Sequence, residues 1–148
     1  MTSGSKSIAA IVALAWACGA QAQELTVQEI KSKGGKQLAA EEVKTTLSGA
    51  TLRYDFADAE TQVRLKADGS LDGVAKRRVG STGGGRAFSG TWNVTDEGRW
   101  CVEVQTFGQG SGGGAICRDV FRLEDKYFYA VGNPRNDARR AIEMSVSK

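Results

Sequence analysis

The stretch GTWNVTDEGRWCVEVQTFGQGSGGGAIC, residues 90–117, decides the fold of this chain. Apolar side chains recur at every second position in its first half, as at Trp92 and Val94, and again at Trp100 and Val102. Successive side chains of a β-strand point to opposite faces, so this period of two indicates strands that bury one face. The stretch therefore predicts neighbouring antiparallel strands, the second of which leads into a glycine-rich loop.

Two cysteines flank this loop, and we expect them to form a disulfide. Cys101 and Cys117 lie on either side of it, where residues of antiparallel neighbours face each other. Two cysteines in an exported chain are typical of one disulfide, and closing a loop of about 15 residues contributes roughly 3 kcal/mol. The alternative to a disulfide is that both cysteines are free thiols buried in the fold. Direct opposition would centre the turn on Gln109, away from the middle of the glycines, so we expect an asymmetric loop or a diagonal bridge.

The glycine run resembles a nucleotide-binding loop only in its spacing. Residues 108–113 match G-x-G-x-x-G, but that motif works between a strand and the N-terminus of a helix, which holds the pyrophosphate. The residues that follow have the composition of a strand, and the lysine of a phosphate loop is missing. We predict no cofactor site here and interpret the run as a solvated loop whose tip includes Gly110 and Gly112.

The two-residue alternation continues along most of the chain. Turn signals such as Asp68-Gly69 separate the alternating segments, and the single proline lies in one of these loops. The predicted strands lie within residues 52–56, 63–65, 71–79, 88–94, 100–105, 115–123, 127–131 and 142–146. The predicted fold class is mainly β: an eight-stranded antiparallel meander that closes as a small lipocalin-like barrel, because closure removes its edges.

One or two short helices are expected before the first strand. Thr26 and Glu29 have the spacing of a capping box, which predicts a helix to about Lys33. A second helix is predicted over residues 40–47, where apolar residues share one face and Ser48-Gly49 follows as a stop signal.

The first residues predict export. A start with one lysine is followed by the apolar run SIAAIVALAWACGA, whose last alanine begins Ala20-Gln21-Ala22; this is the pattern of a signal peptide and its cleavage site. The run is shorter than the roughly 20 residues of a membrane span, and Trp16 argues against lipidation of Cys18. We therefore expect a periplasmic or secreted protein without a membrane span. Its expected parts are a signal peptide at 1–22, an N-terminal helical segment at 23–49 and a barrel-like domain at 50–148.

Composition argues against several classes of chemistry. The chain has no histidine, which removes the commonest general base and the commonest metal ligand. Its 20 basic and 17 acidic residues nearly balance, unlike those of a nucleic-acid-binding protein. Basic pairs such as Arg139-Arg140 are expected on solvated strand faces. The DGSLDG stretch at 68–73 resembles the start of a calcium loop but lacks its twelfth-position glutamate. We predict a non-catalytic protein with no metal, no cofactor and no nucleic-acid partner. If the protein were an enzyme, carboxylates alone would have to carry out its catalysis.

Two functions remain open. In the first, the protein binds another protein or an envelope component, as an inhibitor or accessory factor does, through loop tips that contain Arg86, Gly110 and Gly112. In the second, it carries a small apolar ligand inside the barrel, which would need a cavity above about 300 Å³. The aromatic residues expected either to fill the core or to line such a cavity are Trp92, Tyr54, Phe56 and Tyr129.

The order of motifs resembles a known family. The segments that carry the resemblance are AAEEVKTTLSGATL, KADGSLDG, GTWNV, RWCVEV, AICRDVFRL and KYFYAVG. They resemble small exported proteobacterial proteins that share a domain of unknown function, with a leading helix, a glycine turn, a G-x-W strand and two later cysteines. The resemblance covers most of the expected mature chain and implies no catalytic residue.

A more distant resemblance rests on Gly90-x-Trp92. It is similar to the G-x-W motif of lipocalins and of bacterial metalloprotease-inhibitor barrels. In lipocalins the motif opens the first strand, whereas here it lies about four strands into the barrel. The inhibitor-type barrel is closer in size, export and its single disulfide, but its inhibitory N-terminal arm has no residue-by-residue counterpart here. We therefore expect Trp92 to serve the core, next to a glycine that permits close approach to the backbone.

Overall fold

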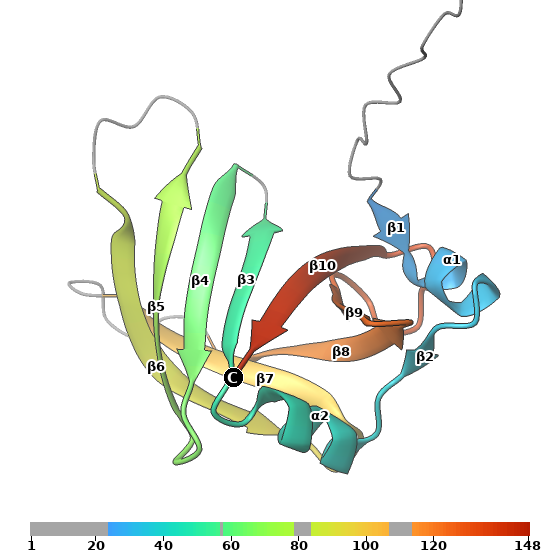
Figure 1. Cartoon of the computed structure of the whole chain (residues 1–148), viewed down its shortest axis with the longest axis horizontal. Coiled ribbons are helices and arrows are strands. Elements are labelled where there is room, and N and C mark those ends of the chain that lie inside the picture. Colours follow the sequence, from blue (N-terminus) through green and yellow to red (C-terminus); the bar gives the residue numbers. More distant parts are fainter. Residues whose placement is uncertain (1–23, 57, 79–83, 107–113) are drawn as a thin grey trace, which may run out of the picture.

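The computed structural model of the chain is shown in Figure 1. It describes residues 24–56, 58–78, 84–106 and 114–148, so the expected signal peptide lies outside the described residues. The helices are α1 (Val27–Ser32) and α2 (Ala40–Leu47). The strands are β1 (Leu25–Thr26), β2 (Lys36–Gln37), β3 (Thr51–Phe56), β4 (Ala59–Leu65), β5 (Ser70–Arg77), β6 (Arg86–Val94), β7 (Arg99–Thr106), β8 (Ile116–Leu123), β9 (Lys126–Ala130) and β10 (Arg140–Ser147).

Strands β3 to β10 form a closed antiparallel barrel. Each pairs with the next along the chain, and β10 closes the ring by pairing with β3, where Met144 lies opposite Tyr54. The two short strands extend this sheet, β1 beside β10 and β2 beside β8. The predicted fold class, a small eight-stranded barrel preceded by short helices, is confirmed.

Both helices begin as the sequence predicts. The Thr26 hydroxyl accepts a hydrogen bond from the Glu29 N–H at 3.2 Å, and the Glu29 carboxylate accepts one from the Thr26 N–H at 2.7 Å. These bonds complete a capping box and lower the pKa of Glu29. At the start of α2, the Glu42 carboxylate accepts a hydrogen bond from the Ala39 N–H at 3.0 Å. Helix α2 covers one end of the barrel, the lower end in Figure 1.

The main core extends from the end of the barrel that α2 covers to Trp100 and Tyr129 in the barrel interior. Val43 and Leu47 of α2 pack with buried side chains from the barrel interior, among them Leu52, Leu65 and Trp92. A separate, smaller core lies where α1 packs against the outside of β8, β9 and β10. This arrangement leaves the opposite end of the barrel, away from α2, as the end where a site can open.

Cys101 and Cys117 form the predicted disulfide. The two cysteines lie directly opposite each other on β7 and β8, so the bridge is not diagonal. The glycine run between them, including Gly110 and Gly112, lies outside the described residues.

Gly90 allows β6 and β7 to approach each other closely. A side chain at this position would overlap the carbonyl of Glu103 and would lie 3.0 Å from the Cα of Val104. We expect Gly90→Ala to lower the free energy of unfolding by about 2 kcal/mol, because overpacking forces the backbone to shift. Urea unfolding followed by circular dichroism measures the change. Gly84→Ala is the control, since a Cβ there meets nothing within 4 Å; an equal loss in both variants would contradict this explanation.

Candidate functional site

The open end of the barrel exposes large apolar side chains. Phe56, Val104 and Ile116 are 39%, 40% and 55% exposed and lie at the ends of β3, β7 and β8 that face away from α2. Each stands an even number of positions from a buried core residue of its own strand, so it lies on the interior face of the sheet. We call these three residues the apolar rim.

Phe56 of the rim, three further aromatic rings and one arginine form a cluster that leads from the rim into the core. The ring centroids of Tyr54 and Tyr129 lie 5.1 Å apart, and those of Trp100 and Tyr129 lie 6.0 Å apart, both edge to face. The guanidinium carbon of Arg118 lies 4.7 Å from the Tyr129 ring centre and 5.8 Å from that of Phe56. These five residues, the aromatic–arginine cluster, come from β3, β7, β8 and β9.

Two buried polar groups of the cluster have no hydrogen-bond partner among the described residues: the Tyr129 hydroxyl and the Trp100 indole N–H. Burial raises the pKa of Tyr129 above its ordinary value, and Tyr54 raises it further. Arg118 opposes this rise, although no hydrogen bond of acceptable geometry joins it to the Tyr129 oxygen. Burial also raises the pKa of Tyr54, again opposed by Arg118. Both phenols therefore stay protonated at neutral pH and can donate.

Three of the four predicted aromatic residues lie in this cluster: Tyr54, Phe56 and Tyr129. The fourth, Trp92, lies toward the closed end of the barrel, where it is buried in the main core. Its indole N–H donates a hydrogen bond to the Lys66 carbonyl at 2.8 Å. Trp92 is thus satisfied within the core and is separate from the open end.

The predicted loop residues are only partly described. Arg86 is the exposed first residue of β6, at the open end of the barrel. Gly110 and Gly112 lie outside the described residues, so the structure adds nothing to their proposed contact with a partner.

Sequence reasoning missed Arg118 and Trp100 as site residues. The alternation in β8 could have identified Arg118. Ile116, Arg118 and Val120 share one face of the strand, and of these three only Arg118 is charged. An arginine between two apolar inward positions indicates a charge inside the barrel. Trp100 was expected in an inward row, but its contact with Tyr129 depends on the closure of the barrel.

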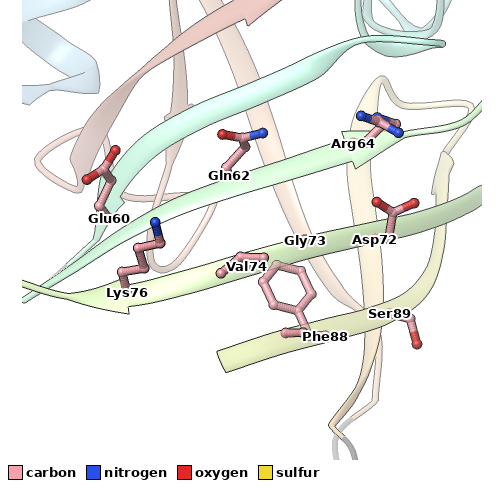
Figure 2. A pocket seen from close by; sticks show the side chains of 10 residues that line it. Glu60, Gln62, Arg64, Asp72, Gly73, Val74, Lys76, Phe88 and Ser89 are labelled. Carbon is pink, nitrogen blue, oxygen red and sulfur yellow. The ribbon is translucent and has the colours of Figure 1, made fainter. Parts of the chain in front are cut away.

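A hollow on the outer face of β4, β5 and β6 has a volume of about 540 Å³ (Figure 2). Exposed polar and charged side chains dominate its lining, and the 2.8 Å ion pair between Lys66 and Asp72 lies at its edge. A side chain at Gly73 in its floor would collide with the Phe88 ring. None of the predicted site residues lines this hollow, and no buried polar group there lacks a partner.

The seam between β3 and β10 opens toward the aromatic–arginine cluster. The pairing of β3 with β10 ends at Tyr54 and Met144, so the last residues of β3 have no partner residue on β10. A groove of about 1100 Å³ runs along this seam, and Tyr54 and Ile142 help to line it. Tyr54 is the one cluster residue that lines this groove, and most of the other lining residues are polar or charged.

Two further observations bear on function. Within residues 24–148, outside the undescribed segments, no group of three or more Asp, Glu or Cys residues is placed to hold a metal ion. No helix in the described ranges is long and apolar enough to cross a membrane.

No protein-family model matches the sequence, and no curated protein matches it. The family resemblance stated from the motifs therefore stays a prediction.

Proposed function

We propose that this chain is an exported, non-catalytic binding protein that takes up a small apolar molecule of the cell envelope at the open end of its barrel. The observation that carries this proposal is the apolar rim, three large hydrophobic side chains exposed on the interior face around a cluster of aromatic rings. Exposed apolar surface with a few polar groups at its base is typical of ligand sites.

The proposal is a variant of the second predicted function, with the ligand at the barrel mouth and not in an interior cavity. The first depends on loop tips that are largely undescribed, whereas the second rests on described side chains of the barrel wall. Because the main core fills the closed end, the ligand would occupy a shallow mouth and not a deep calyx. The disulfide supports export, since such bonds persist in oxidising compartments.

A neutral fluorescent probe, N-phenyl-1-naphthylamine, tests the proposal by titration into the purified mature chain. We expect saturable binding that Val104→Gln weakens about fivefold, because a polar side chain replaces apolar contact at the rim. Val74→Gln is the matched control, since Val74 is 37% exposed on the outer face of β5. The proposal fails if the probe does not saturate, or if both variants weaken binding equally.

A further inference from the structure

Arg118 carries a positive charge inside the mouth of the barrel. It stands on β8 between Ile116 at the rim and Val120, which is fully buried. At about 3.3 Å per residue, its Cα lies roughly 7 Å further along the strand than that of Ile116, on the side of the buried Val120. The charge is therefore deeper than the apolar rim.

No carboxylate of this chain neutralises Arg118. Every Asp and Glu of the sequence falls within the described residues, and none of them forms an ion pair with Arg118. A half-buried guanidinium without a counter-ion is costly, and the rings of Tyr129 and Phe56 offset only part of that cost.

The side chains next to Arg118 supply hydrogen-bond donors and no negative charge. The Tyr129 hydroxyl and the Trp100 indole N–H are both buried without a partner among the described residues. Both belong to the ring cluster over which Arg118 lies. A guanidinium without a carboxylate partner, next to donors that lack an acceptor, favours an anionic ligand with accepting oxygens.

We propose that Arg118 binds the carboxylate of an amphipathic ligand, a long-chain carboxylic acid, which enters the barrel head first. The inference rests on the proposed binding function and names its ligand class. The carboxylate pairs with the Arg118 guanidinium, while the alkyl chain lies against Phe56, Val104 and Ile116 and leads outward. A planar carboxylate matches the two-pronged geometry of arginine.

The experiment compares laurate with methyl laurate, which has the same alkyl chain without the charge. Each displaces N-phenyl-1-naphthylamine from the wild type, from Arg118→Gln, from Arg118→Lys and from Arg64→Gln, an exposed control on the outer face of β4. We expect the wild type and Arg64→Gln to bind laurate about 10- to 100-fold more tightly than the ester. Arg118→Gln should lose this preference, and Arg118→Lys should keep part of it.

The outcomes separate this inference from the function on which it rests. If the probe binds but laurate and its ester compete equally in the wild type, the carboxylate inference is wrong and the binding function stands. If the probe itself does not bind, the binding function is wrong. Tighter competition by dodecyl phosphate than by laurate would overturn the choice of a singly charged head group. Probe binding by Arg118→Gln shows that this variant is folded.

Discussion

Replacing Asp119 by alanine is expected to lower the free energy of unfolding by about 3–5 kcal/mol, because it leaves a buried arginine without its counter-ion. The Asp119 carboxylate lies 2.5 Å from Nη2 of Arg139 and 3.3 Å from Nε of Arg99. The side chains of Asp119 and Arg139 are only 6% and 5% exposed. In the variant, the guanidinium of Arg139 stays buried without a carboxylate unless its side chain or the surrounding backbone rearranges.

Arg139 cannot move freely because it joins two parts of the fold. Its carbonyl accepts a hydrogen bond from the N–H of Val27, the first residue of α1, at 3.1 Å. Its guanidinium carbon lies 6.0 Å from the ring centre of Phe121, which belongs to the smaller core beneath α1. Loss of Asp119 should therefore loosen the contact of α1 with the barrel as well as expose an unpaired charge.

Urea unfolding followed by circular dichroism measures this loss, and an exposed ion pair provides the control. Lys126 and Glu143 lie 3.0 Å apart with about half of each side chain exposed, so Glu143→Ala should cost below about 1 kcal/mol. A double variant, Asp119→Leu with Arg139→Met, should regain most of the stability, since apolar replacement of a buried pair is often neutral. If Asp119→Ala lowers the free energy of unfolding no more than Glu143→Ala does, the buried ion pair does not stabilise the fold.

This ion pair also shows where sequence reasoning stops. The sequence suggests that Arg139-Arg140 lies on a solvated strand face, which holds for exposed Arg140 but is wrong for buried Arg139. The two residues are adjacent and chemically identical, so no local pattern distinguishes them. Buried Arg139 pairs with a carboxylate 20 positions earlier in the chain, on β8. That pairing depends on the register of the closed barrel.

The elements themselves were predictable because their signals are local. The capping box of Thr26 and Glu29 and the alternation in β6 and β7 each act over a few residues, and the structure confirms them. The candidate site combines side chains from four strands, so only its individual members were visible in the sequence. Tyr54 and Tyr129 were expected as inward aromatic residues, but their edge-to-face contact requires that β10 lie between β3 and β9.

Removal of the disulfide is expected to lower the free energy of unfolding by about 3 kcal/mol. Cys101 and Cys117 are 16 positions apart, so the bridge closes a loop that the unfolded chain would otherwise sample freely. Four residue pairs join β7 to β8 in the described residues, compared with seven between β6 and β7. The bridge thus supports one of the shorter ladders of the barrel. Urea unfolding of Cys101→Ala with Cys117→Ala, compared with the wild type, measures the effect.

A reducing agent provides the control for this prediction. It should shift the unfolding of the wild type to that of the double variant and should leave the double variant unchanged. Because about 3 kcal/mol is less than the usual total stability of a domain, the reduced protein should remain folded in buffer. Cys117 lies between Ile116 and Arg118, so reduction should also weaken the binding of laurate at the mouth. Equal urea midpoints with and without the bridge would show that the disulfide does not stabilise the native barrel.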